Sequence, residues 1–167
     1  IVFPNSNNNV VFADIKRGKD IIRVYNMHLQ SIKISPDVSE LDEKNIDAID
    51  QGKSQKLFYR ISKAFKQQQQ QAEIIMEHKK DCPYPIIICG DMNNSAFSYV
   101  YRKIKGSLKD SFEEAGKGFG ATYKFRYYPA RIDYIFVDES MKVKKFESFS
   151  DFENSDHFPI MAKLSIE

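Results

Sequence analysis

Four short segments of the sequence place polar side chains beside apolar runs. They are Asn26-Met27-His28, Gly90-Asp91-Met92-Asn93, Arg131-Ile132-Asp133 and Ser155-Asp156-His157-Phe158-Pro159. A histidine at a strand end or a Gly-Asp-x-Asn turn is ordinary when taken alone. Asp133 is harder to explain as structure alone, because it enters an apolar run and a buried carboxylate is costly unless a cation or a donor pairs with it. A protonated histidine is the obvious partner.

These segments contain the residue types that hydrolysis of a phosphate ester requires. That reaction needs a metal ion to neutralise phosphoryl oxygens, a base to activate water, and an acid or metal to stabilise the leaving oxygen. Asp91 and Asp156 offer hard oxygen ligands suited to Mg²⁺ or Mn²⁺. His157 paired with Asp133 predicts an oriented general base.

Two further side chains complete the predicted site. Asn93 is suited to hold a phosphoryl oxygen or the attacking water, and His28 is suited to act as the acid or as a second phosphate contact. The third histidine, His78, belongs to none of the four segments. We expect it near the end of a helix, where a favourable interaction with the helix dipole is a sufficient explanation.

In their order along the chain, the four segments resemble the C-terminal motifs of the endonuclease/exonuclease/phosphatase superfamily. That superfamily includes deoxyribonuclease-type nucleases, abasic-site endonucleases, sphingomyelinases and inositol-polyphosphate phosphatases. The matching runs are Asn26-Met27-His28-Leu29, Gly90-Asp91-Met92-Asn93, Arg131-Ile132-Asp133-Tyr134-Ile135-Phe136 and Ser155-Asp156-His157-Phe158-Pro159. The resemblance implies an α+β chain with the deoxyribonuclease I-like four-layer α/β/β/α sandwich, in which two packed sheets carry helices outside.

The resemblance also implies a role for each side chain. His157 would be the general base and Asp133 would orient it. Asp156, together with Asp91, would bind Mg²⁺ or Mn²⁺. Thr122 lies where family members often carry a threonine that contacts the phosphate.

The other two roles concern the substrate. Asn93, with Asp91, would position the nucleophile and the phosphate, and His28 would contact or protonate the phosphate or the leaving group. The catalytic set implied by the resemblance is thus His157, Asp133, Asp91, Asn93 and His28, and the substrate-binding set is Asn93, Thr122 and His28.

The stretch from Gly90 to Tyr134 resembles one uncharacterised bacterial branch of the family. Some members of that branch carry membrane segments ahead of the catalytic domain. The longest apolar runs of this sequence, such as Pro85 to Cys89, are far shorter than the roughly 20 residues that a transmembrane helix needs. We therefore expect a soluble fragment and leave open whether the full-length protein is tethered to a membrane.

Family domains begin with an early strand that carries an asparagine and then a glutamate that is a principal metal ligand. This sequence has no counterpart to either before His28, and Glu40 and Glu43 follow that motif. We expect residues 1–167 to be a single truncated domain without its N-terminal portion. Weak Mg²⁺ binding, impaired turnover and self-association through an uncovered apolar sheet are the predicted consequences.

The elements that must position these side chains follow from periodicity and turn residues. Apolar and β-branched runs predict strands over 10–15, 20–28, 85–89, 131–137, 141–149 and 160–166. Helical spacing predicts helices over 54–82, capped by Ser54 and ended by Pro83, and over 96–104 and 108–115. Residues 32–52 are expected to form an excursion loop with a weak helical turn, and 116–120 a flexible loop. Adjacent strands without helical crossovers favour α+β layering.

Composition limits the remaining possibilities. A chain of 167 residues with 42% hydrophobic residues is long enough for one domain with a core. Its 25 Lys and Arg residues nearly balance 23 Asp and Glu residues, so the net charge of +2 provides no strong field for recruiting nucleic acid. Cys82 and Cys89 flank a predicted strand and are expected to be buried free thiols. The glutamines from Gln67 to Gln71 fall within the helical pattern, and we interpret them as a solvated helix face without function.

Two questions about function stay open. Nucleic acid, lipid or small-molecule phosphate esters all fit the predicted chemistry. Basic residues that could follow a nucleic-acid backbone are more often a solvated surface; they are Lys103, Lys105, Lys109, Arg126, Lys142, Lys144 and Lys145. The alternative from another class is a non-catalytic interaction module that retains the fold, against which the five intact positions of the catalytic set argue.

Overall fold

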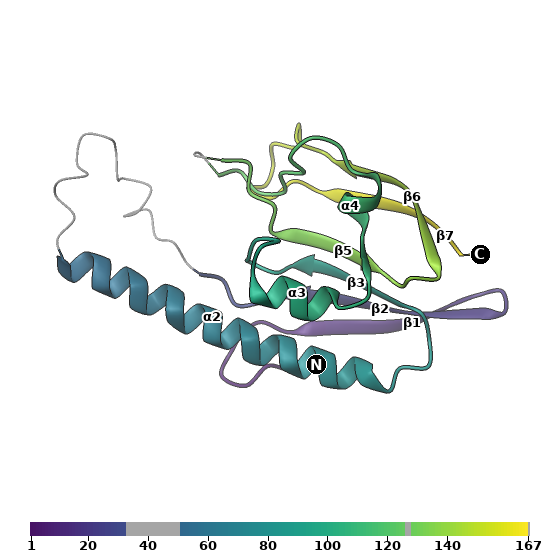
Figure 1. Cartoon of the computed structure of the whole chain (residues 1–167), viewed down its shortest axis with the longest axis horizontal. Helices are drawn as coiled ribbons and strands as arrows, with labels where there is room; N and C mark the ends of the chain where they lie inside the picture. Colours follow the sequence, from purple (N-terminus) through teal and green to yellow (C-terminus); the bar gives the residue numbers. More distant parts are fainter. Residues whose placement is uncertain (33–50, 126–127, 167) are drawn as a thin grey trace.

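The computed structural model describes residues 1–32, 51–125 and 128–166. Its central sheet has five strands in the order β1-β2-β3-β5-β4, and β6 and β7 form a separate two-stranded sheet (Figure 1). The strands are β1 Val10–Arg17, β2 Asp20–His28, β3 Ile86–Asp91, β4 Lys109–Asp110, β5 Asp133–Val137, β6 Met141–Ser148 and β7 Ile160–Ile166. The helices in the described residues are α2 Gln51–Lys80, α3 Tyr99–Lys105 and α4 Ser111–Ala115. This arrangement confirms the predicted mixture of strands and helices.

The predicted N-terminal hairpin is confirmed. Strands β1 and β2 pair antiparallel, with Arg17 opposite Asp20, and Gly18 takes a φ of 63° in the turn between them. That positive φ suits glycine, which lacks a Cβ. Strand β2 ends at His28, as predicted, while the excursion loop predicted over 32–52 lies almost wholly outside the described residues.

The register of the central strands brings the predicted site residues into one row. Strand β2 runs parallel to β3, with His28 opposite Asp91, and β3 runs antiparallel to β5, with Asp91 opposite Asp133. Three carboxylate or imidazole side chains from distant parts of the sequence are therefore neighbours across three strands. The pairing of the strands sets this arrangement.

Helices α2 and α3 cover one face of the central sheet (Figure 1). Alternate residues of the strands point to that face and meet apolar side chains of the helices, as strand geometry requires. The core contains Tyr25, Met27, Ile88, Tyr134 and Phe136 from the strands and Ala72, Ile75, Val100, Tyr101 and Ile104 from the helices. Burial of this apolar surface holds the helices on the sheet.

Several predicted helix boundaries are wrong. Helix α2 already begins at Gln51, so Ser54 lies inside its first turn and does not cap it. Helix α3 begins after Ser98, whose side chain caps it by accepting a 3.1 Å hydrogen bond from the backbone N–H of Tyr101. The helix predicted over 108–115 is instead the short strand β4 followed by α4, capped by Asp110. Capping patterns locate helix ends only to within a few residues.

The interpretation of the glutamine run as a solvated face is wrong for two of its members. Gln68 and Gln71 are only 0% and 3% exposed. They lie three residues apart on α2, on the side that also carries the core residues Ala72 and Ile75. Helical periodicity therefore turns both amides toward the sheet, where they make hydrogen bonds.

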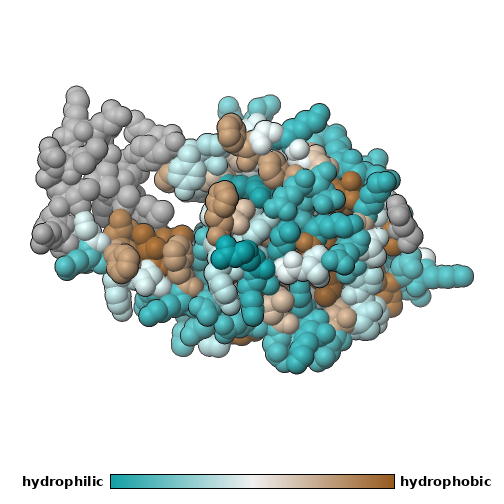
Figure 2. Space-filling view, in the orientation of Figure 1, coloured by the Kyte–Doolittle hydropathy of each residue, from teal (hydrophilic) through white to brown (hydrophobic). Residues whose placement is uncertain are grey.

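The opposite face of the sheet is partly uncovered. Val11 and Ile15 of β1 are 64% and 50% exposed, and Val11 pairs with Asn26 on the face that points away from α2. The first half of α2 also exposes apolar side chains, which gather on the surface in Figure 2. The large ones there are Phe58, Tyr59 and Phe65. The predicted exposure of an apolar sheet face is thus found at β1, while the apolar residues of β2, β3 and β5 on that face are half-buried.

Two smaller expectations can be checked in the described part of the chain. Cys82 and Cys89 are free thiols, as predicted, although both are half-buried instead of fully buried. No described helix combines the length and the hydropathy needed to cross a membrane.

Gly90 provides a test of the close contact between β2 and β3. Its φ is 125°, and a Cβ at this position would lie 2.0 Å from the carbonyl oxygen of Met27. We predict that Gly90→Ala lowers the free energy of unfolding by at least about 2 kcal/mol, because the strands would have to separate and the backbone would be strained. Urea denaturation of the variant measures this loss.

Gly18→Ala is the matched control. It also introduces a Cβ at a positive φ, but nothing lies within 4 Å of that position. Its free energy of unfolding should fall by only about 1 kcal/mol, the cost of placing alanine at a positive φ. Equal losses in the two variants would show that the β2–β3 contact adds nothing to the effect of φ.

Candidate active site

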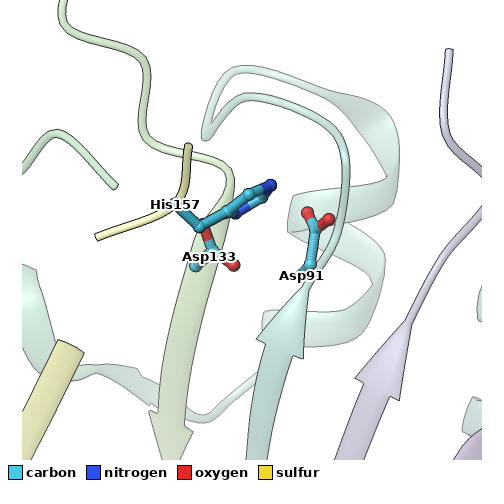
Figure 3. Close-up of side chains that lie close together, drawn as sticks. All are labelled: Asp91, Asp133 and His157. Atoms are coloured by element: carbon cyan, nitrogen blue, oxygen red, sulfur yellow. The ribbon is translucent and has the colours of Figure 1, made fainter. Parts of the chain in front are cut away.

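The candidate site lies at the ends of the central strands, where Asp91, Asp133 and His157 point toward one another (Figure 3). Asp91 ends β3 and Asp133 begins β5. His157 comes from the loop before β7 and forms an isolated β-bridge with Tyr123. One carboxylate oxygen or ring nitrogen from each of the three lies within 4.8 Å of those of the other two.

His157 and Asp133 form the predicted imidazole–carboxylate pair. The Nδ1 atom of His157 lies 2.9 Å from Oδ2 of Asp133, and both side chains are half-buried. The backbone N–H of His157 donates to Oγ of Ser155 at 3.0 Å, and the imidazole meets the Tyr123 ring edge to face. The carboxylate binds Nδ1 and so leaves Nε2 as the ring nitrogen available to exchange a proton.

The surroundings of His157 alter its proton affinity. Burial lowers the pKa of the imidazole, but the hydrogen bond and charge of Asp133, with the charges of Asp91 and Asp156, outweigh burial and raise the pKa above 6.5. The negative charges favour the imidazolium form. The imidazolium form of His157 is therefore more stable than that of a free histidine.

Asp91 carries the second carboxylate of the cluster. Its Oδ1 accepts a 2.6 Å hydrogen bond from the backbone N–H of Asn93, and its Oδ2 lies 3.5 Å from Nε2 of His28. Burial raises the pKa of Asp91 to about 6, against the opposing effect of the Asn93 N–H, and the charge of Asp133 adds to the rise. A charged carboxylate at this position is therefore stabilised by added positive charge.

Asn93 connects the ends of β2 and β3. Its φ of 50° is in the left-handed region, and its side-chain Nδ2 donates to the backbone carbonyl of Leu29 at 3.0 Å. This contact joins the turn after Asp91 to the residue after His28. The structure thus places Asn93 beside Asp91 and beside the end of the strand that carries His28. Its contact with a phosphate stays a prediction.

Thr122 occupies a different place from the one predicted. Its side chain is fully buried, and Oγ1 accepts hydrogen bonds of 3.0 Å from the backbone N–H groups of both Ile132 and Asp133. Its carbonyl accepts from the N–H of Phe158 at 2.8 Å. Thr122 therefore holds the start of β5 beside the loop that carries His157, and its buried hydroxyl is oriented toward backbone instead of the open site.

Asp156 is not part of the cluster. Its side chain is exposed, its charge helps to raise the pKa of His157, and its backbone carbonyl accepts from the N–H of Lys124 at 2.7 Å. His157 joins Asp91 and Asp133 in the cluster, and Asp156 lies outside it. The predicted pairing of Asp156 with Asp91 as metal ligands is not what the structure brings together.

The donor set in the cluster nevertheless fits a divalent cation. Two carboxylates and an imidazole are the oxygen and nitrogen ligands that Mn²⁺ and related cations accept, and carboxylates suit Mg²⁺. Among the described residues, the group that could hold such an ion is Asp91, Asp133 and His157. A cation bound to all three would compete with the hydrogen bond between His157 and Asp133.

A groove of about 420 Å³ gives access to the imidazole–carboxylate pair. His157 and Asp133 lie along it, together with Asn26 and Cys89 on the uncovered face of the sheet. The rest of its lining includes the aromatic side chains Phe152 and Phe158. The imidazole–carboxylate pair is therefore reached from the uncovered face of the sheet.

Sequence reasoning missed side chains that support the site from behind. The sequence predicts Thr122 as a phosphate contact and Gln68 as part of a solvated helix face. Gln68 donates to the backbone carbonyls of Gln30 and Asn93 at 2.7 and 3.2 Å. The available signal was positional, because Gln68 shares the helical face of Ala72 and Ile75.

Comparison with known proteins identifies the class to which this fold and site belong. Residues 25–157 match the model of the Endonuclease/Exonuclease/phosphatase family. The matched stretch includes His28, Asp91, Asp133 and His157, and the chain belongs to this family. Members of the family hydrolyse phosphoester bonds. The search of curated proteins found no match to this sequence.

Solved structures share the fold at low sequence identity. A functionally unknown conserved protein from Enterococcus faecalis is 22% identical with a TM-score of 0.66, and the match covers 95% of this chain and 56% of that one. Mannosyl-6-phosphatase from Bacteroides thetaiotaomicron is 21% identical with a TM-score of 0.53, and the match covers 89% of this chain and 53% of that one. TDP2 from D. rerio, complexed with single strand DNA product, is 17% identical with a TM-score of 0.65. That match covers 99% of this chain and 65% of that one. The chain thus spans little more than half the length of most of these proteins.

The raised pKa of Asp91 predicts a gain in stability when its charge is removed. The pKa of Asp91 is about 6 in the folded chain against 3.8 for the free group. Protonation of Asp91 therefore stabilises the fold fully below pH 3.8, and this stabilisation is lost as the pH rises through 6. We predict that Asp91→Asn raises the free energy of unfolding by about 1 to 3 kcal/mol at neutral pH with EDTA present.

Chemical denaturation across this pH range measures the effect. The free energy of unfolding of the wild-type chain should fall as the pH rises from 3.8 to 6, and that of the variant should fall less. Asp151→Asn, which removes an exposed carboxylate, is the control and should change little. An Asp91→Asn variant that is no more stable than the control would contradict the assigned cost of burying this charge.

Proposed function

We propose that this chain carries part of the active site of a divalent-metal-dependent phosphoesterase in which His157 is the general base. The observation that carries the proposal is the 2.9 Å pair of His157 and Asp133 directly beside Asp91. An imidazole oriented by a carboxylate, next to a second buried carboxylate, combines a base with a cation-binding group. Membership of the family supports the same chemistry.

The proposed reaction starts with proton transfer at His157. Asp133 accepts the hydrogen bond from Nδ1–H, so Nε2 takes a proton from the attacking water and the carboxylate stabilises the resulting imidazolium. The water oxygen forms a bond to phosphorus as the bond to the leaving oxygen breaks. His28, exposed beside Asp91, is placed to donate a proton to that leaving oxygen or to contact the phosphate.

A bound Mg²⁺ or Mn²⁺ would supply charge neutralisation of the phosphoryl oxygens. In this chain Asp91 would hold it, and Asn93 would position the phosphate or the water beside that carboxylate. We retain Asp156 only as a charge near His157, since its side chain is not in the cluster. The proposed role of Thr122 is to hold Asp133 and the His157 loop, not to bind phosphate.

The raised pKa of His157 predicts the pH dependence of the reaction. The base acts in its neutral form, so turnover should increase as the pH rises through a value above 6.5. Asp133→Asn keeps an acceptor for Nδ1–H but removes the negative charge, which lowers the pKa of His157. The acid limb of the pH–rate profile should move to lower pH while the maximal rate falls.

Rates on an activated phosphodiester, measured with Mg²⁺ and with Mn²⁺, test this prediction. The NMR titration of His157 should shift in the same direction as the acid limb. An acid limb at the same pH in wild type and Asp133→Asn would contradict the role of His157 as the titrating base.

Removal of the imidazole gives the most direct test of the mechanism. We predict that His157→Ala lowers kcat by roughly 10² to 10⁴-fold, the usual contribution of a general base. The assay uses a panel of phosphate esters and a metal titration, with a full-length member of the family beside the 167-residue chain. His78→Ala is the matched control, because His78 contacts Tyr25 and Phe12 away from the site.

The 167-residue chain should turn over more slowly than a full-length protein if additional metal ligands lie outside it. Equal activity of wild type and His157→Ala would end the proposed mechanism. In that case the non-catalytic interaction module would be the better account of the fold.

Two classes of substrate fit the proposed chemistry. The solved structures with the same fold include a mannosyl-6-phosphatase and a TDP2 complexed with single strand DNA product. The net charge of +2 favours neither class, since strong attraction to nucleic acid usually needs a marked excess of basic residues. Within the substrate panel, cleavage of DNA with steep salt dependence would indicate a nuclease, and preference for a sugar or lipid phosphate would indicate a phosphatase.

We also propose that the chain self-associates through its uncovered sheet face. Val11 and Ile15 are exposed there, and contiguous apolar surface of this kind favours association. Light scattering of the wild-type chain should show a dimer or larger species, and Val11→Lys with Ile15→Lys should shift it to monomer. A stable, compact wild-type monomer would count against this proposal.

A further inference from the structure

The buried amide of Gln68 connects helix α2 to both strand ends that lead into the site. Its Nε2 donates to the backbone carbonyl of Gln30 at 2.7 Å and to that of Asn93 at 3.2 Å. Its Oε1 accepts from Nδ2 of Asn94 at 2.8 Å. Both amide hydrogens and one acceptor position are therefore engaged, as expected for a polar group that is fully buried.

Gln71, one turn further along the same face of α2, provides a useful contrast. Its Oε1 accepts from the backbone N–H of Gln30 at 2.8 Å, and its Nε2 reaches Oγ of Ser6 at 3.4 Å. Gln30 is thus bound through both its N–H and its carbonyl. Of the two glutamines, only Gln68 has a direct hydrogen bond to the segment after Asp91.

That segment needs support because its conformation is costly. Asn93 has a φ of 50°, and a non-glycine residue in this region persists only when its surroundings hold it there. This conformation aims the backbone N–H of Asn93 at Oδ1 of Asp91, 2.6 Å away. Gln68 holds the carbonyl of the same residue and the side chain of the next one, Asn94.

We propose that Gln68 is a positioning residue, which fixes the turn from Asp91 to Asn94 and thereby the orientation of the Asp91 carboxylate and the Asn93 side chain. The carboxamide suits this task because it donates and accepts at one point. Glutamate lacks the two hydrogens, lysine lacks the acceptor, and methionine has neither while keeping a similar length and volume. The effect on catalysis rests on the proposed function, whereas the effect on the turn does not.

The first experiment measures the turn itself. Amide hydrogen exchange of the 167-residue chain is followed at Asn93 by NMR in wild type and Gln68→Met. We expect the Asn93 amide to exchange at least about tenfold faster in the variant, because the turn opens more often without its hydrogen bonds to α2. Amides in the middle of β3 and β5 should keep their protection.

Two controls separate positioning from general loosening of the helix. Gln69→Met changes the same residue type on the exposed side of α2, where Gln69 contacts only Glu73 among the hydrogen bonds described, and should leave Asn93 unchanged. Gln71→Met should speed exchange at Gln30 more than at Asn93. Unchanged exchange at Asn93 in Gln68→Met, or an equal change in all three variants, would overturn the proposal.

A second variant covers the case in which Gln68→Met does not fold. Asn94→Ala removes the side-chain donor to Gln68 together with the Oδ1 acceptor for the backbone N–H of Ser95, and it leaves α2 intact. It should also speed exchange at Asn93, by a smaller factor than the loss of Gln68. Wild-type exchange in Asn94→Ala would overturn the proposal in the same way.

The catalytic consequence is tested separately. With an activated phosphodiester and Mn²⁺, Gln68→Met should lower kcat by about tenfold or more through misplacement of the site, with little change in KM, while Gln69→Met should match wild type. Altered exchange with unaltered kcat would overturn the catalytic importance of the turn but not its control by Gln68. Absence of activity in wild type would instead count against the proposed function, and the exchange result would still decide the positioning role.

Discussion

The close pairing of three central strands is the constraint on which the rest of the structure depends. Strand β2 lies so near β3 that Gly90 has no room for a Cβ against the carbonyl of Met27. The same pairing sets His28 opposite Asp91, and the next strand sets Asp91 opposite Asp133. Carboxylates would not gather at this spacing by themselves, because like charges repel. Backbone hydrogen bonds and apolar burial on the α2 side hold them there, and the imidazole of His157 partly compensates for the cost.

The burial and close spacing of these charged groups shift their pKa values. Burial raises the pKa of Asp91, while the surrounding carboxylates raise the pKa of His157. Both shifts favour bound positive charge, whether as protons or as a cation. Such a cluster destabilises the fold somewhat and is poised for function, a combination common at active sites.

Much of the fold and part of the site could be predicted from the sequence because they follow from periodicity and residue type. The strands ending at His28 and near Asp91 stand out as apolar runs, and the need of Asp133 for a cationic partner pointed to His157. Asp156 could not be placed in this way, since residue type does not reveal which of two neighbouring loop side chains joins the cluster.

Other features depended on tertiary contacts that residue type does not reveal. Gln68 is polar and sits in a run of glutamines, yet the helix turns it into the interior, where backbone carbonyls satisfy it. Thr122 is predicted as a phosphate contact from its position relative to the family motifs, but its hydroxyl accepts hydrogen bonds from the backbone at the start of β5. Helix ends were also misjudged, because local capping signals compete with packing that is visible only in three dimensions.

The row of strand ends has a consequence for how the protein acquires its site. His28, Asp91, Asp133 and His157 come from widely separated parts of the chain, and β2 reaches its parallel neighbour β3 only across the long helix α2. Contacts between such distant residues form late in folding, since a large loop must close before they add stability. A folding intermediate that contains the β1–β2 hairpin and α2 would have no assembled cluster. Binding of a divalent cation to this cluster would therefore report completed folding and would protect the native state from unfolding by mass action.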